Sequence, residues 1–207
     1  MVQPDAPAEA APSSSRCADA GGCSRGAAAR AVLAFDDGLA SQAEAVRLLR
    51  GNGLTATFYI PSGLLGRTGR MTPAQVRDLA KAGHEIGGHT LTHARLPDLP
   101  PDARRRQLCD DRTALRTLTG QDVRSVAYPY DASDPATTRI ARSCGYQHIR
   151  PKAPLTVLNT TTLTTLRHHA TRGGTFVFHD ICPTACGRYS IDRQTLKAFL
   201  TWLAQSS

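Results

Sequence analysis

The sequence contains few aromatic residues and no long hydrophobic run. Phe, Trp and Tyr make up 5% of the 207 residues, and there is a single Trp. No apolar stretch approaches the roughly 20 residues that a membrane-spanning helix needs, so we expect no membrane insertion. The first residues lack both a basic start and an apolar segment, and we do not expect them to form a signal peptide.

The sequence also lacks a recognisable nucleic-acid-binding motif, although its formal net charge is +8. The basic residues are scattered along the chain, and aromatic residues that would stack on bases are scarce. We therefore expect no nucleic-acid partner, and we interpret the charge as mainly solvated surface.

The N-terminal segment differs in composition from the rest of the chain. Residues 1–29 are rich in Ala, Pro, Ser and Gly and hold few large apolar side chains, so we expect a flexible leader. A chain of 207 residues is long enough for one domain with a full core and too short for two comfortable ones. The predicted organisation is a leader over 1–29 followed by one domain over 30–207, acting as a monomer.

Six cysteines are present, an even number without the spacing of a zinc ribbon. We interpret them as disulfides formed in an oxidising compartment, while reduced buried thiols remain the alternative. Six cysteines permit 15 pairings. Short loops between the cysteines favour Cys17 with Cys23 and Cys182 with Cys186. This choice leaves Cys109 with Cys144 as the third pair.

Apolar runs alternate with segments of helical periodicity along the chain. The pattern predicts strands over residues 31–35, 55–60, 85–88, 125–127, 146–149 and 175–178. It predicts helices over 41–51, 72–83, 100–119, 135–144, 161–170 and 191–204. Such alternation is typical of an α/β fold with a parallel sheet covered by helices, and a barrel is the closed version of that sheet.

Polar residues follow two of these predicted strands directly. Asp36 and Asp37 end the first strand and precede a glycine, whereas His89 and His93 follow the third strand. Two histidines four residues apart on a helical turn would share one face. One carboxylate and two imidazoles make a three-ligand site with an open position, typical of catalytic zinc, and the second carboxylate is left over as a base. The alternative for the acidic pair alone is a turn that caps the next helix.

These motifs, together with Ala127–Tyr130 and Val177–Asp180, resemble in order the motifs of the polysaccharide deacetylases, the NodB-type carbohydrate esterases. The resemblance covers about residues 30–204. It implies an irregular (β/α) barrel of about seven parallel strands, with the active site at the carboxyl ends of the strands.

The resemblance also implies roles for individual residues. Asp37, His89 and His93 would bind Zn²⁺ or another divalent transition metal such as Co²⁺, and Asp36 would be the base. His179 would be the acid that protonates the leaving amine; the alternative is a core histidine.

The resemblance implies one more role, in the third motif of the family, which corresponds to Ala127–Tyr130. The backbone N–H of Tyr130 would help to stabilise the oxyanion, and the Tyr130 side chain has packing as its alternative role.

Two departures from the family pattern lie in the same third motif. Ala127 stands where the family has an arginine that pairs with the base, and Asp131 replaces a glycine. The fourth motif of the family is not recognisable. Because Arg150 follows the predicted strand 146–149, it is our candidate for the missing cation, with a surface arginine in a turn as the alternative.

The resemblance implies removal of N-acetyl groups from amino sugars in a polysaccharide such as chitin oligomers, peptidoglycan or a biofilm polymer. The expected location is outside the cell or in the cell wall. Two alternatives stay open: an esterase that removes O-acetyl groups from xylan, and a carbohydrate-binding protein on the same barrel that has lost turnover.

Overall fold

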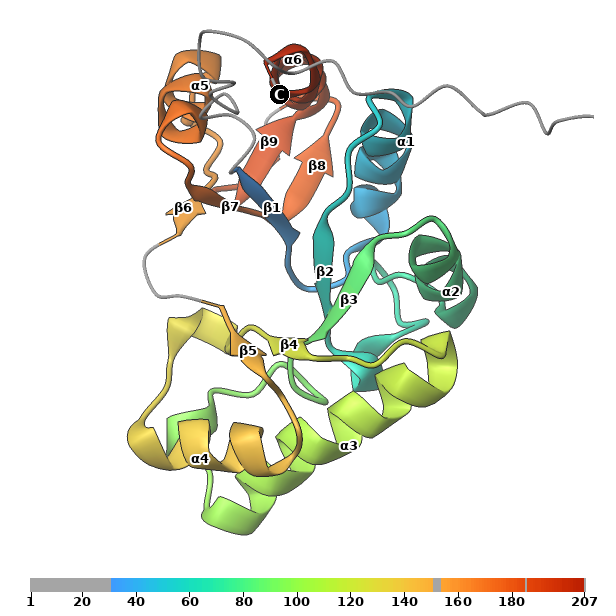
Figure 1. The fold of residues 1–207 in the computed structure, drawn as a ribbon, viewed down its shortest axis with the longest axis vertical. Helices are drawn as coiled ribbons and strands as arrows, with labels where there is room; N and C mark the ends of the chain where they lie inside the picture. Colours follow the sequence, from blue (N-terminus) through green and yellow to red (C-terminus); the bar gives the residue numbers. More distant parts are fainter. Residues whose placement is uncertain (1–30, 151–153, 185, 207) are drawn as a thin grey trace, which may run out of the picture.

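The computed structural model describes residues 31–150, 154–184 and 186–206, which fold around one curled parallel sheet (Figure 1). Its strand order is β5-β4-β3-β2-β1-β7-β6. The strands are β1 (Val32–Phe35), β2 (Thr57–Ile60), β3 (Glu85–Gly88), β4 (Ser125–Val126), β5 (His148–Ile149), β6 (Leu155–Thr156) and β7 (Thr175–Phe178). Because β5 and β6 stand at the two ends of this order, the described part of the barrel is open between them. The predicted seven-stranded irregular barrel is confirmed.

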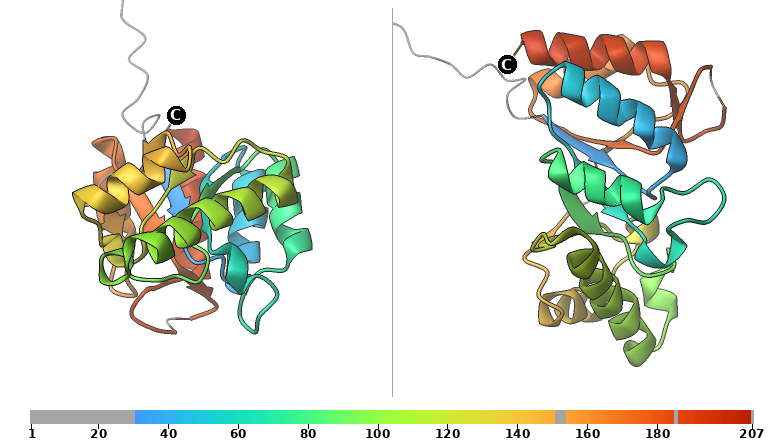
Figure 2. Two further views of the ribbon diagram at one scale, coloured as in Figure 1. Left: turned by 90° about the horizontal axis from the view of Figure 1, so that it is seen from below. Right: turned by 90° about the vertical axis from the view of Figure 1, so that its right-hand side faces the viewer.

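Helices cover the outer side of the sheet (Figures 1 and 2). They pack side by side in two groups. In one group α3 lies between α4 and α2, and in the other α6 lies between α1 and α5. Their bounds are α1 (Ala43–Gly51), α2 (Pro73–Lys81), α3 (Pro101–Thr119), α4 (Pro135–Ser143), α5 (Leu163–Thr171) and α6 (Arg193–Gln205). Short 3-10 turns are η2 (Ala40–Gln42), η3 (Ser62–Leu64), η4 (Leu96–Asp98) and η5 (Pro129–Asp131). Within the described ranges, no helix has both the length and the apolar character to cross a membrane.

The core on the helix side is built from aromatic residues of neighbouring strands. Phe35 is in register with Phe58 on β2 and with Phe178 on β7, and its ring stacks on theirs at centroid distances of 4.9 and 5.1 Å. Phe199 of α6 packs against this stack. The few aromatic residues of the chain are therefore concentrated where the helices meet the sheet.

The inner face of the sheet carries a second, smaller buried cluster that includes Ala34 and Val177. Side chains alternate between the faces of a strand, so the residues two positions further on, Asp36 and His179, emerge on this inner side. The Asp36 N–H donates to the Phe178 carbonyl at 2.9 Å, which continues the pairing of β1 with β7 past the last strand residue. Strand alternation thus directs both polar side chains into the barrel mouth.

The sequence signals for helix ends are mostly confirmed. Thr72 and Gln75 form a complete capping box at the start of α2, and α3 ends at Gly120, which has a left-handed φ of 72°. All six predicted strands and six predicted helices are present. Three strands were not predicted: β6 and the separate parallel pair of β8 (Asp180–Cys182) and β9 (Ser190–Asp192). Strands of two or three residues are too short to show alternation by themselves, and the equally short β4 and β5 were found because the predicted ranges 125–127 and 146–149 extend beyond them.

Two of the three predicted disulfides are present. One joins Cys109 in α3 to Cys144 after α4, and the other joins Cys182 to Cys186 in the loop that follows β8. The predicted pair Cys17–Cys23 and the predicted leader lie outside the described residues.

The bond between Cys109 and Cys144 closes a loop of 35 residues, so it restricts the unfolded chain. Replacing both cysteines by alanine should lower the free energy of unfolding by about 2–4 kcal/mol, measured by urea denaturation. Dithiothreitol should destabilise the wild type by a similar amount, apart from any contribution of Cys182–Cys186, which the double variant retains. Equal stability of wild type and double variant would show that these two thiols are reduced in the folded protein.

Candidate active site

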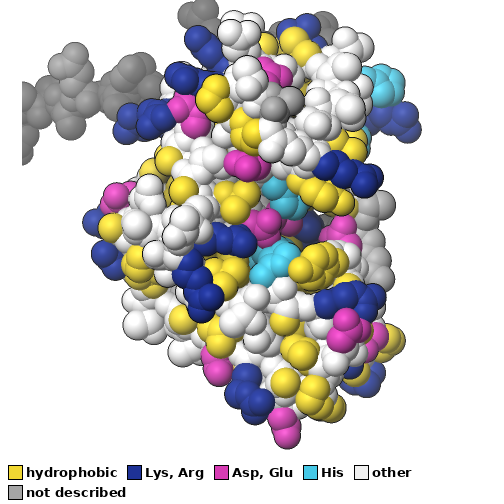
Figure 3. All heavy atoms as spheres, turned by 180° about the vertical axis from the view of Figure 1, so that it is seen from behind, with side chains coloured by type: hydrophobic (Ala, Val, Ile, Leu, Met, Phe, Trp, Pro, Cys, Tyr) yellow, Lys and Arg dark blue, Asp and Glu magenta, His cyan; other side chains and the backbone are white. Residues whose placement is uncertain are grey.

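The carboxyl ends of the strands open into one cavity of about 670 Å³. Figure 3 shows histidine and acidic side chains gathered in a hollow of the surface, with basic side chains around it. All seven site residues predicted from the sequence line this cavity, namely Asp36, Asp37, His89, His93, Tyr130, Arg150 and His179. The structure therefore brings together residues that lie up to 143 positions apart in the chain.

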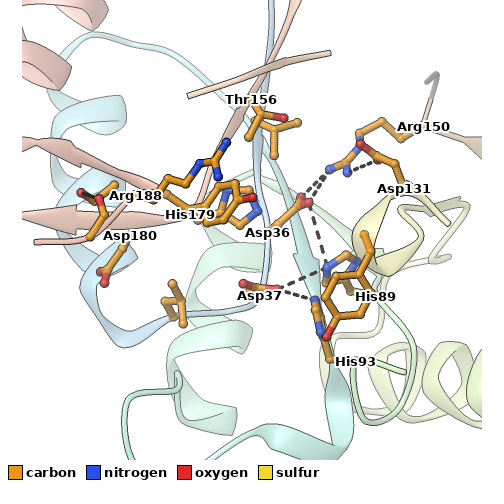
Figure 4. A pocket seen from close by; sticks show the side chains of 16 residues that line it. Asp36, Asp37, His89, His93, Asp131, Arg150, Thr156, His179, Asp180 and Arg188 are labelled. Carbon is orange, nitrogen blue, oxygen red and sulfur yellow. Dashed lines mark hydrogen bonds and ion pairs between the residues drawn. The ribbon is translucent and has the colours of Figure 1, made fainter. Parts of the chain in front are cut away.

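Asp37, His89 and His93 direct three donor atoms at one point (Figure 4). The Asp37 Oδ1 atom lies 2.9 Å from His93 Nε2 and 3.4 Å from His89 Nε2. This oxygen is buried and accepts no well-aligned hydrogen bond from any described residue. A buried carboxylate oxygen facing two imidazole nitrogens is the donor set of a divalent transition metal, so the residues fit such an ion.

The ring of His89 is held in the orientation that metal binding requires. Its Nδ1 lies 2.8 Å from the carbonyl oxygen of Ala127, which fixes the proton on Nδ1 and leaves the Nε2 lone pair free. Its backbone N–H donates to Asp111 Oδ2 at 3.0 Å. The ring orientation is therefore set by the barrel and not by the metal.

The segment from His89 to His93 is a loop, so the predicted helical turn is wrong. Thr90 and His93 have left-handed φ angles of 64° and 60°, which a right-handed helix cannot contain. Gln107 of α3 holds the loop instead, since it accepts hydrogen bonds from the N–H groups of Leu91 and Thr92. The two rings still converge, with centroids 4.9 Å apart.

Charges within the donor set favour an ionised Asp37. Burial alone would raise the pKa of this carboxyl, but the facing imidazoles of His89 and His93 hold it well below its usual range. In the absence of an ion, burial lowers the pKa of His89, and the neighbouring carboxylates of Asp37 and Asp36 outweigh it and raise that pKa. A metal ion and a proton would therefore compete for His89 Nε2, so metal binding should weaken as the pH falls.

Asp36 has a cation of its own, although its Oδ2 atom also lies 4.0 Å from His89 Nε2. Arg150 Nη1 lies 2.5 and 2.6 Å from the two carboxylate oxygens of Asp36, and Arg150 Nη2 lies 3.1 Å from Asp131 Oδ1. The side chains of Asp36 and Arg150 are only 3% and 6% exposed. Burial disfavours the charged guanidinium, yet Asp36 and Asp131 raise the pKa of Arg150 above its ordinary value. The cation expected in place of the arginine missing at Ala127 thus comes from the end of β5.

His179 and Tyr130 complete the walls of the cavity (Figure 4). The His179 Nδ1 atom is buried without a hydrogen-bond partner among the described residues, which agrees with the unrecognisable fourth motif. Tyr130 has a left-handed φ of 61°, and its ring meets the His93 ring edge-on at 4.9 Å. Gln42, fully buried, donates from Nε2 to the carbonyl oxygens of Asp36 and His179 and ties their two strand ends together.

Asp111 and Gln42 were missed by the sequence analysis. Asp111 is fully buried in α3, and its carboxylate accepts hydrogen bonds from the N–H groups of Ser62 and His89. Burial raises its pKa to about 6 despite these bonds. A signal was available, because Asp111 lies between Leu108 and Leu115 on the apolar stripe of the helix, where a carboxylate is out of place.

The chain resembles known polysaccharide deacetylases in sequence. The family model for polysaccharide deacetylase matches residues 25–149. A peptidoglycan-N-acetylglucosamine deacetylase of Bacillus cereus is 32% identical over 104 residues, which cover 49% of this chain and 36% of the relative. The chain spans less than half the length of the curated relatives it matches.

Two solved structures share the fold. A peptidoglycan N-acetylglucosamine deacetylase superposes with a TM-score of 0.67 at 21% identity, over 84% of this chain and 81% of the other. A family 4 carbohydrate esterase from Streptomyces lividans superposes with a TM-score of 0.64 at 19% identity, over 85% of this chain and 86% of the other. The matched family region and the barrel together show that the chain belongs to the polysaccharide deacetylase family.

Proposed function

We propose that this chain removes N-acetyl groups from the amino sugars of a polysaccharide with the help of a divalent metal ion. The proposal rests on one observation, that two adjacent carboxylates have different contacts. Asp37 faces two imidazoles, whereas Asp36 is held by Arg150. One carboxylate is thereby suited to bind a cation and the other to accept a proton.

Each of these residues has a role in the hydrolysis of an acetamide bond. An ion held by Asp37, His89 and His93 would polarise the acetyl carbonyl and make water a better nucleophile. Asp36 takes a proton from the attacking water, while Arg150 keeps the Asp36 carboxylate ionised and oriented. The backbone N–H of Tyr130 stabilises the oxyanion, and His179 donates a proton to the departing amine. The products are acetate and a free amino sugar.

Zinc is the metal we favour, since two imidazoles and one carboxylate with an open position are typical of a catalytic zinc. The substrates we favour are chitin oligomers, peptidoglycan or a biofilm polymer. Such polymers lie outside the membrane, so we propose that the protein acts outside the cell or in the cell wall; the two disulfides suit that compartment. The monomeric state stays a prediction.

The proposed reaction predicts acetate release from N-acetylated glycans and its loss in Asp36→Asn, which keeps the shape of the side chain but cannot accept a proton. Turnover should fall by about 10²- to 10⁴-fold, measured by enzymatic acetate detection on chitin oligomers and peptidoglycan, with acetylated xylan as the test of esterase activity. The exposed variant Asp110→Asn is the matched control.

Acetate from xylan alone would replace the proposed activity by the esterase alternative. No acetate from any of these substrates would leave a carbohydrate-binding protein. Loss of bound metal together with activity in Asp36→Asn would make Asp36 a ligand.

The donor set predicts close to one divalent ion per chain, measured by mass spectrometry of the metals in the purified protein. His93→Ala should remove most of that ion, because a third ligand is lost. The exposed helix residue His168 offers a control of the same chemistry, and His168→Ala should keep the ion. Full metal content in His93→Ala would exclude the proposed ligand set.

The contact between Arg150 and Asp36 predicts that Arg150→Met lowers turnover about 100-fold through misorientation of the base, with a smaller effect on stability. Asp131→Gly should also lower turnover, since it releases Arg150 Nη2. Its stability should stay within about 1 kcal/mol of the wild type, because Asp131 has a left-handed φ of 49° that favours glycine.

A double-mutant cycle separates this coupling from simple damage. In the Arg150→Met background, Asp131→Gly should have no further effect on turnover. Independent, multiplying losses from the two substitutions would contradict the proposed link from Asp131 through Arg150 to Asp36.

A further inference from the structure

A second arginine lines the cavity, and no acidic side chain in the described part of the chain pairs with it. Arg188 lies just before β9, and its carbonyl accepts a hydrogen bond from the Asn159 N–H at 2.9 Å. The next residue, Tyr189, accepts the Asp180 N–H at 3.1 Å through its own carbonyl. The backbone is therefore anchored directly after the Arg188 side chain. Within the described residues, the guanidinium of Arg188 forms no hydrogen bond and no ion pair.

This free guanidinium contrasts with Arg150 across the cavity. In Figure 4 the two arginines lie on opposite sides of Asp36, and of these two arginines Arg150 is the one that contacts the Asp36 carboxylate. Asp180 also lines the cavity close to Arg188 in sequence, but the two side chains form no ion pair, and Asp180 Oδ1 accepts a hydrogen bond from the Ser41 hydroxyl at 2.5 Å. The positive charge of Arg188 therefore stays available to a ligand in the cavity.

Tyr189 orients the guanidinium without neutralising it. The Arg188 guanidinium carbon lies 5.6 Å from the centre of the Tyr189 ring, within the range of a cation–π contact. The same ring lies 5.6 Å from the ring of His179 and is 51% exposed. The wall thus runs from the proposed acid, through an exposed aromatic ring on which a sugar can pack, to an uncompensated cation.

We propose that Arg188 and Tyr189 form a subsite for a sugar that carries a carboxylate, so that the cavity selects acidic glycans over neutral chitin. A planar guanidinium binds a carboxylate through two parallel hydrogen bonds, and an aromatic face packs on the apolar side of a sugar ring. This inference rests on the proposed function for its biological meaning. It concerns binding, however, and can be tested without turnover.

The test compares two tetrasaccharides that differ in their acidic groups. One is the neutral N-acetylglucosamine tetramer, and the other alternates N-acetylglucosamine with N-acetylmuramic acid, whose lactyl ether adds a carboxylate. Dissociation constants are measured by titration calorimetry on the full chain carrying Asp36→Asn, which prevents hydrolysis. The acidic ligand should bind about 10-fold more tightly, and this preference should shrink at high salt.

Arg188→Gln should remove the preference and leave the affinity for the neutral ligand within about twofold, because only the charge-assisted bonds are lost. Arg139→Gln removes the same charge from an exposed position in α4 and should keep the preference. In the active enzyme, Arg188→Gln should raise KM for the acidic substrate and leave kcat unchanged.

The outcomes separate the subsite from the proposed function. Equal affinity for both ligands in the parent chain, or a preference that survives Arg188→Gln, would overturn the subsite even if acetate is released. A preference that depends on Arg188 in a protein that releases no acetate would support the subsite and contradict the proposed deacetylation.

Discussion

The ion pair between Asp36 and Arg150 requires the sheet to curl. Asp36 follows β1 and Arg150 follows β5, and three strands separate these two in the sheet. Neighbouring strands are spaced about 4.8 Å apart, so in a flat sheet the two strand ends would be about 19 Å from each other, beyond the reach of an arginine. The observed distance of 2.5 Å exists because the sheet curves into a barrel. A buried carboxylate in turn needs a cation of this kind, so the fold and the charge balance of the site depend on each other.

Strained loops and buried polar groups around the mouth of the barrel position the donor atoms. Asp37, Thr90, His93 and Tyr130 all have left-handed φ angles, which cost energy and persist only where surrounding contacts hold them. Asp111 supplies such contacts from α3, since it binds the backbone of His89 directly. Gly88, which directly precedes His89, leaves room for the Tyr146 hydroxyl, because a Cβ at Gly88 would meet this hydroxyl at 2.0 Å.

The sequence predicted those parts of the site that follow directly from strand ends. Asp36 and His179 each come after an apolar run and Arg150 comes after the predicted strand 146–149, and parallel strands bring their carboxyl ends to one edge. It could not predict the geometry of the loop from His89 to His93, because spacing alone does not distinguish a helical turn from a strained loop held by Gln107. It also missed Arg188, since an exposed loop arginine is distinguished only by what surrounds it in space.

The most direct test of this account is the crystal structure of the protein grown with zinc, with anomalous scattering recorded at the zinc edge. We expect one strong peak bound by Asp37, His89 and His93, while Asp36 stays outside the coordination sphere and keeps its contact with Arg150. An ion bound through Asp36, or located at Asp180, Cys182 and Cys186 instead, would contradict the division of roles between the two carboxylates.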